Sequence, residues 1–98
     1  MKNIRIGING FGRIGRAVFR VIHEREDMEV IAINDLADKR SLAHLLKYDS
    51  IHRTFSAVVS TSDQSIIVDG RAVSLTHESQ LEKISWLVMD KKLQVEKF

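Results

Sequence analysis

The sequence has no cysteine and no proline among its 98 residues. Without cysteine, the chain cannot form disulfides or thiolate metal sites, and it cannot supply a cysteine nucleophile. No apolar run is long enough to span a bilayer, and the first residues lack the extended apolar core of a signal peptide. We therefore expect a cytoplasmic protein with no membrane partner.

An excess of charge of one sign is also missing. The 15 basic and 13 acidic residues are interspersed and give a net charge of +2. No basic stripe of the kind that binds nucleic acid is present, so we expect no nucleic-acid partner. The histidines and acids are not spaced as metal ligands, so we expect no metal site. The length suits one small domain over residues 1–98.

Glycine is scarce, but it is concentrated near the amino terminus. Four of the five glycines lie within the first fifteen residues, and Gly10, Gly12 and Gly15 form G-x-G-x-x-G. A β-rich run at 4–8 precedes this motif, and a helix-compatible segment at 17–25 follows it. In a dinucleotide site, such glycines permit a tight turn, a close approach of pyrophosphate and close packing of helix on strand. The helix start, with unpaired N–H groups, favours an anion.

An acidic residue follows at the distance that such a site requires. Asp35 lies twenty positions after Gly15, just beyond a second apolar run at 30–33. A carboxylate there can accept hydrogen bonds from both ribose hydroxyls and would repel a 2′-phosphate, so we predict NAD as the cofactor. Two alternatives remain. The glycines could serve packing alone, or Asp35 could cap a helix that begins near Asp38, although Asp38 suits that role better.

Hydrophobic periodicity predicts the first half of the fold. Strands are expected at 4–8 and 29–33. The first helix is expected to bury Ile14, Val18, Val21 and Ile22 and to leave Arg16 and Arg20 to solvent. A second helix is expected at 38–48, with Leu42, Ala43, Leu45 and Leu46 facing inward.

From residue 55 the period changes to that of β-strands. Runs at 57–60, 66–68 and 72–75 predict strands, and Asp69-Gly70 predicts a two-residue type I′ hairpin turn. A loop is expected at 49–53, and a further strand is expected at 86–89, which the charged residues 90–92 interrupt. The predicted fold class is α/β, a partial Rossmann-type parallel sheet (β-α-β-α) with an antiparallel β-hairpin insertion.

Several segments resemble the amino-terminal NAD-binding region of glyceraldehyde-3-phosphate dehydrogenase. They are INGFGRIGR at 8–16, AINDL at 32–36, LLKYDSIH at 45–52 and VDGRAV at 68–73. The resemblance covers about residues 3–86. Residues 36–49 also resemble the related erythrose-4-phosphate dehydrogenase, which remains an alternative, as does a stand-alone nucleotide-binding domain without catalysis.

The resemblance implies an NAD-dependent, phosphorylating aldehyde dehydrogenase of glycolysis that forms homotetramers in its family. It implies that backbone groups at Phe11, Gly12, Arg13 and Ile14 contact the cofactor phosphates. It also implies that Asp35 binds the adenosine ribose and that Asn9 supports the loop. The predicted cofactor-binding set is therefore Asn9, Gly10, Phe11, Gly12, Arg13, Ile14, Gly15 and Asp35.

The chain also departs from the family pattern. Glu78-Ser79 stands where the family has a Glu-Arg pair near the adenine, and Arg53 stands where it has glycine. The Thr-Gly pair expected after Trp86 is absent, so residues 87–98 form an atypical tail. The cysteine nucleophile and histidine base of the family's chemistry have no counterpart here, so we predict no catalytic residue in this chain. We expect a truncated subunit that lacks its catalytic domain.

Overall fold

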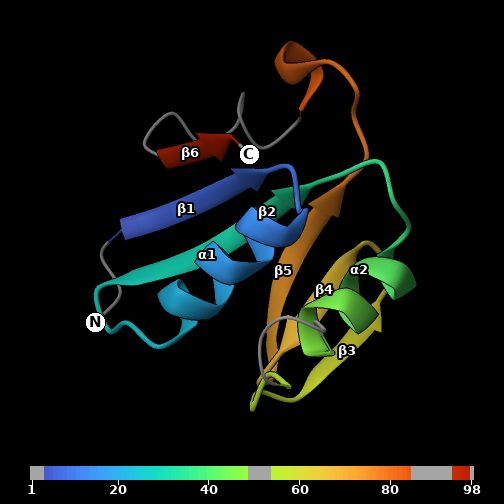
Figure 1. Cartoon of the computed structure of the whole chain (residues 1–98). Coiled ribbons are helices and arrows are strands. Elements are labelled where there is room, and N and C mark those ends of the chain that lie inside the picture. The colour runs from blue at the N-terminus through green and yellow to red at the C-terminus, as the bar shows by residue number, and fades with distance from the viewer. Residues whose placement is uncertain (1–3, 49–53, 85–93, 98) are drawn as a thin grey trace.

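The computed structural model describes residues 4–48, 54–84 and 94–97. The elements in chain order are β1 (Ile4–Asn9), α1 (Arg13–His23), β2 (Met28–Asn34), α2 (Lys39–Lys47), β3 (Val59–Ser62), β4 (Ser65–Val68), β5 (Arg71–Thr76), the 3₁₀ turn η1 (Leu81–Lys83) and β6 (Gln94–Lys97). The strands form one six-stranded sheet in the order β3-β4-β5-β2-β1-β6 (Figure 1).

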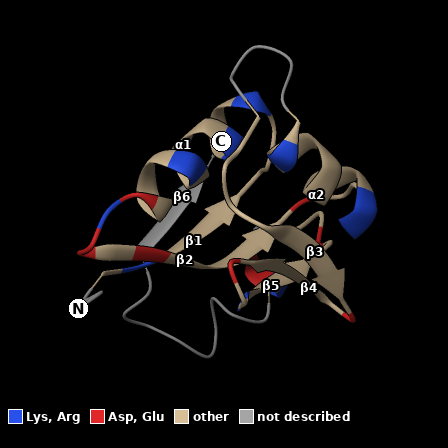
Figure 2. Ribbon diagram, turned by 90° about the horizontal axis from the view of Figure 1, so that it is seen from below, with Lys and Arg blue, Asp and Glu red and all other residues tan. Residues whose placement is uncertain are grey.

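The sheet combines a parallel part with an antiparallel part. Strands β5, β2, β1 and β6 are parallel neighbours, whereas β3, β4 and β5 are joined by antiparallel pairing. Both helices cover the same face of the sheet (Figures 1 and 2). The predicted fold class, a partial Rossmann-type sheet with an antiparallel hairpin insertion, is confirmed.

The core lies between the helices and the sheet. Ile6 and Ile8 of β1 and Ile33 of β2 are buried and share one hydrophobic cluster with residues of both helices. These strands are rich in β-branched residues, which pack well on a pleated surface. The register between β1 and β2 shifts between Ile6 and Gly7, so that Ile31 of β2 has no partner in β1. The shift leaves one extra residue on β2, as a β-bulge or a similar irregularity does.

The predicted inward face of α1 was partly right, because Ile22 is buried and Val18 packs against the core, but it was wrong for Ile14 and Val21. Ile14 and Val21 have exposed fractions of 65% and 63%, whereas Gly15, Phe19 and Ile22 are buried. The buried stripe therefore runs at spacings of four and three residues from Gly15, about one position away from the predicted stripe. The prediction left out Phe19 as well as Gly15, and Gly15 has no side chain that could give a hydrophobic signal.

The two arginines predicted to face solvent are also partly buried. Arg16 Nη1 donates to the carbonyl oxygen of Phe11 over 3.2 Å, and Arg20 Nη2 donates to the carbonyl oxygen of Leu46 over 2.5 Å. The Arg20 guanidinium also lies 5.2 Å from the centre of the Phe55 ring. The aliphatic part of each side chain can cover apolar surface while its head group reaches a carbonyl.

The second helix follows its prediction more closely. Leu42, Ala43 and Leu46 are buried, as expected, but Leu45 is exposed. Asp38 is the N-cap, because its Oδ1 accepts a hydrogen bond from Ser41 N over 2.8 Å. None of the helices in the described part of the chain has the length and apolar character needed to cross a membrane.

The hairpin turn is confirmed. Val68 pairs with Arg71, and both intervening residues have positive φ, 50° at Asp69 and 80° at Gly70. Two successive positive φ values define the type I′ turn.

The tail contains a strand that the sequence did not predict. β6 pairs in parallel with β1, from Gln94 opposite Ile6 to Lys97 opposite Asn9. The loop expected at 49–53 and the strand expected at 86–89 lie outside the described residues.

A candidate dinucleotide site at the ends of β1, β2 and β5

The turn between β1 and α1 has a geometry that depends on glycine. Gly10 has φ of 103°, a left-handed conformation, and its N–H donates to the carbonyl oxygen of Asn34 over 2.8 Å. A Cβ atom at Gly15 would collide with the carbonyl oxygen of Gly10, so helix and turn can approach this closely only at a glycine. A Cβ at Gly12, by contrast, would meet no atom within 4 Å. The space in front of Gly12 is therefore open.

The start of α1 faces this open space. Gly12 is the N-cap and has no side-chain capping bond, and the first turn of the helix contains no acidic residue. Gly12, Arg13 and Ile14 are exposed. The first N–H groups of a helix have no partner within the helix and carry about half a positive charge between them. The arrangement can bind an anion through backbone N–H groups.

Asp35 lies beside this helix start and is held in place by two backbone groups. Its Oδ2 accepts a hydrogen bond from Phe11 N over 2.7 Å, and its Oδ1 accepts one from Ala37 N over 3.0 Å. Asp35 therefore shapes the turn before α2 without being the N-cap. The Phe11 amide is engaged by this carboxylate, so Gly12, Arg13 and Ile14 carry the amides that remain for a phosphate.

The Phe11 side chain belongs to the core. It is 1% exposed and meets the Phe19 ring edge to face, with ring centres 5.8 Å apart. Because the Phe11 ring is packed in the core, it anchors the backbone of the glycine-rich turn.

Asn34 is a residue of this site that the sequence analysis missed. It is 3% exposed, and its amide uses every donor and acceptor position that it has. Its Nδ2 donates to Asn9 Oδ1 over 3.0 Å and to the carbonyl oxygen of Glu78 over 2.8 Å. Its Oδ1 accepts from Thr76 Oγ1 over 2.6 Å and from Glu78 N over 2.9 Å. The signal for it was a polar residue that continues a buried apolar strand.

The Asn34 amide ties together three chain segments that meet at one edge of the sheet. They are the end of β1 at Asn9, the end of β2, and the segment that follows β5. Asp35 adds to this connection, because its N–H donates to the carbonyl oxygen of Thr76 over 3.0 Å and its own carbonyl lies 2.7 Å from His77 Nδ1. The structure thus brings all the predicted site residues to one edge, Asn9 to Gly15 in the turn and Asp35 against it.

Comparison with known proteins identifies the family. Residues 4–97 match the family model described as glyceraldehyde 3-phosphate dehydrogenase, NAD binding domain. The chain belongs to this family. NAD is the cofactor of this domain, as predicted, and the match extends through most of the tail that we expected to be atypical. Among the described residues, no group of three histidine or acidic side chains could hold a metal ion.

Several curated relatives are similar to this chain. Glyceraldehyde-3-phosphate dehydrogenase of Thermotoga maritima is 52% identical over 84 residues, which are 84% of this chain and 25% of that protein. Glyceraldehyde-3-phosphate dehydrogenase 1 of Bacillus cereus is 50% identical over 82 residues, with the same two shares. The protein of that name from Lactobacillus delbrueckii subsp. bulgaricus is 50% identical over 91 residues, 89% of this chain and 27% of the relative. The chain spans about a quarter of the length of these relatives.

The site has the donors and the acid that NAD requires. Exposed amides at the start of α1 suit a pyrophosphate, and no carboxylate in the first helical turn would repel it. The Asp35 carboxylate, fixed at the end of β2, suits a pair of ribose hydroxyls. The residues present therefore fit the adenosine ribose and the pyrophosphate of the cofactor.

Proposed function

We propose that this chain holds the adenosine diphosphate part of NAD at the ends of β1 and β2. The N–H groups of Gly12, Arg13 and Ile14 receive the pyrophosphate, and Asp35 accepts hydrogen bonds from the ribose hydroxyls. The observation that carries this proposal is the contact between Asp35 Oδ2 and Phe11 N, which fixes the acid beside the helix start. Gly10 and Gly15 shape the turn. Asn9, at the end of β1 where the turn begins, accepts a hydrogen bond from Asn34 Nδ2 and is thereby fixed.

Gly12→Ala tests this proposal. The Gly12 backbone has φ of −77°, which alanine adopts readily, and an added methyl group would meet no protein atom within 4 Å. The variant should therefore fold as the parent does. A bound pyrophosphate would have to move away from the methyl group, so we expect affinity for NAD to fall at least tenfold in isothermal titration. An unchanged affinity in a variant with an unchanged melting temperature would contradict the assigned position of the pyrophosphate.

We further propose that the complete protein oxidises an aldehyde phosphate with NAD as hydride acceptor, as the names of the relatives indicate for glyceraldehyde 3-phosphate. In this proposal, the residues of this chain bind and orient the cofactor, and the groups that react with the substrate belong to other residues of the protein. A cytoplasmic location and assembly into a homotetramer belong to the same proposal.

An assay of aldehyde oxidation separates cofactor binding from catalysis. The 98-residue chain, supplied with NAD, phosphate and glyceraldehyde 3-phosphate, should show no turnover, because it contains no cysteine to form the covalent intermediate. Turnover by the purified chain would contradict the assignment of catalysis to other residues.

A further inference from the structure

An exposed aromatic ring lies beside the acid that we assign to the ribose. His77 follows Thr76, the last residue of β5, and its side chain is exposed. The Nδ1 atom of His77 lies 2.7 Å from the carbonyl oxygen of Asp35. Figure 1 shows the end of β5 beside the segment that follows β2, at the edge of the sheet where the glycine-rich turn also lies. The imidazole is therefore part of the proposed cofactor site.

The backbone is fixed on both sides of His77. The N–H of Asp35 donates to the carbonyl oxygen of Thr76 over 3.0 Å. On the other side, Glu78 N donates to Asn34 Oδ1 over 2.9 Å, and Asn34 Nδ2 donates to the carbonyl oxygen of Glu78 over 2.8 Å. The contact between the imidazole and the Asp35 carbonyl adds a third restraint. A ring held in this way has little conformational freedom left to lose when a ligand packs on it.

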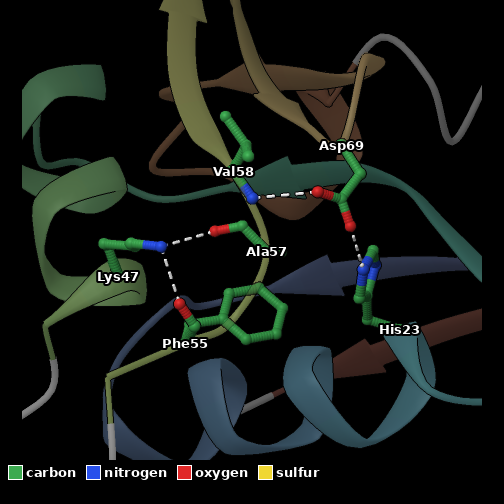
Figure 3. A network of polar contacts seen from close by, with 6 residues as sticks. All are labelled: His23, Lys47, Phe55, Ala57, Val58 and Asp69. Atoms are coloured by element: carbon green, nitrogen blue, oxygen red, sulfur yellow. Dashed lines mark hydrogen bonds and ion pairs between the residues drawn. The ribbon is translucent and has the colours of Figure 1, made fainter.

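A second histidine shows what an imidazole looks like when its contacts lie within the protein. His23 lies at the opposite end of the sheet, where it lines a cavity of about 180 Å³ between β2 and β5. Its ring stacks on Phe19 at an interplanar angle of 9° and meets the edge of Phe55, and its Nε2 lies 2.9 Å from Asp69 Oδ2 (Figure 3). No aromatic ring in the described part of the chain stacks on His77 in this way. The faces of the His77 ring are therefore available to a ligand.

The orientation of His77 follows from its hydrogen bond. A carbonyl oxygen only accepts, so Nδ1 of His77 carries the hydrogen and donates it to Asp35. This bond turns one edge of the imidazole toward Asp35. Leu36, the residue after Asp35, is 69% exposed. The acid is therefore flanked by an exposed aromatic ring and an exposed apolar side chain, which suit a flat, largely apolar group.

Adenine is such a group, and the ribose carries it to this place. In NAD the base is attached to the ribose carbon next to the one that bears the 2′-hydroxyl. A ribose whose hydroxyls bind Asp35 therefore brings its base against the residues around this acid. Purine rings stack on aromatic side chains, and histidine is among the side chains that proteins use for this purpose.

We propose that the His77 imidazole packs against the adenine ring of NAD and forms one side of its binding site. This inference rests on the proposed position of the ribose at Asp35. His77 is then a residue that contacts the cofactor directly, and its Nδ1 bond to the Asp35 carbonyl holds the ring in place. Loss of an aromatic ring that stacks on a base lowers affinity by roughly fivefold to a hundredfold.

Titration of ADP into the 98-residue chain tests the proposal, because ADP carries the base, the ribose and the diphosphate without nicotinamide. His77→Ala should bind ADP roughly tenfold more weakly than the parent and should keep the parent's melting temperature, since the side chain is exposed. Gly12→Ala tests the diphosphate separately. ADP affinity that falls in Gly12→Ala but not in His77→Ala would overturn the role of His77 and leave the proposed function standing. No ADP binding by the parent would overturn both.

Two further variants separate stacking from an effect transmitted through Asp35. His77→Phe keeps an aromatic ring but loses the Nδ1 donor, whereas His77→Gln keeps an N–H donor but loses the ring. We expect His77→Phe to bind ADP within about threefold of the parent and His77→Gln to be as weak as His77→Ala. The reverse order would show that the histidine acts only by holding Asp35, and it would overturn the proposal. His44→Ala, at an exposed histidine of α2, is the control and should change nothing.

Nuclear magnetic resonance observes the contact itself. With ADP bound to the parent chain, we expect nuclear Overhauser effects between the ring protons of His77 and H2 or H8 of adenine. We also expect both adenine resonances to move upfield, because a proton above an aromatic ring is shielded by it. His77→Gln should lose this shift. The absence of both signals at saturating ADP would place the base elsewhere and overturn the proposal.

Discussion

The two ends of the β2 strand are held in place by different kinds of contact. At its carboxyl end, the ordering contacts come from backbone groups and from one buried amide, that of Asn34. At its amino end, they come from side-chain ion pairs that solvent reaches, Glu29 with Arg71 and, nearby, His23 with Asp69. The first end should therefore be sensitive to added atoms and lost amides, and the second to charge and pH.

The contrast has an energetic basis. A backbone position such as Gly15 cannot adjust to a new Cβ without moving a strand or a helix, because protein interiors are close-packed. An exposed ion pair contributes at most about 1 kcal/mol, since water and salt screen it. The nucleotide end is thus the rigid end, and the opposite end is the one whose surface can change at little cost.

The largest effect is expected from Gly15→Ala. The new Cβ would collide with the carbonyl oxygen of Gly10, so the free energy of unfolding should fall by about 3 kcal/mol, as for severe overpacking. Urea unfolding followed by circular dichroism measures this. Gly12→Ala is the matched control, because its methyl group has room, and it should change stability by less than about 0.5 kcal/mol. Equal losses in the two variants would remove the steric distinction between the two glycines.

Asn34→Leu should have the next largest effect. Leucine is similar in size but leaves the Glu78 backbone and Asn9 Oδ1 without their partner, which costs about 2 kcal/mol of unfolding free energy. NAD affinity should fall with it, because the turn and the segment after β5 lose their common tie. Asn9→Ala removes one of these contacts and should cost less. A variant as stable as the parent would show that the amide does not organise this edge.

Asp35→Asn tests cofactor choice at the same end. Asparagine keeps one oxygen to accept the hydrogen bond from Phe11 N, although its Nδ2 cannot accept the bond from Ala37 N, and the charge that repels a 2′-phosphate is gone. We expect the ratio of NAD to NADP affinity to fall by roughly tenfold, which corresponds to about 1.4 kcal/mol. Titration of both cofactors gives the ratio. Asp63→Asn, in the turn between β3 and β4, serves as a control for net charge. A ratio unchanged in Asp35→Asn would exclude this carboxylate from the discrimination.

The smallest effect is expected from acid at the opposite end. The Val58 amide and His23 lower the pKa of Asp69 in the folded chain below 3.8. The contacts of the Asp69 carboxylate with these two groups therefore stabilise the fold above that pH. This contribution is lost as the pH falls through the lowered folded pKa. Urea midpoints at pH 7 and below 3 should therefore differ less in Asp69→Asn than in the parent. A pH dependence identical in the two would mean that this pair does not couple protons to folding.

The nucleotide end could be predicted from sequence to a large extent. The glycine spacing and the position of Asp35 are local signals, and the backbone conformations that they require arise within a few residues. Asn34 was missed because its importance depends on Glu78 and Thr76, which are more than forty positions away in sequence. The inward face of α1 was predicted correctly at Ile22 and Val18 and missed at Gly15 and Phe19, and Gly15 gives no hydrophobic signal because it packs without a side chain.

The sequence by itself determined the order of strands and helices from β1 to β5, the glycine-rich turn, the acid after the second strand and the hairpin at Asp69-Gly70. Each of these depends on the conformational preferences of a few neighbouring residues. Tertiary structure alone decided which face of α1 is buried, that Phe11 gives its N–H to Asp35, that β6 pairs with β1, and that β2 and β5 diverge around a cavity. These features depend on contacts between distant segments, and a local pattern carries no information about which distant group will be the partner.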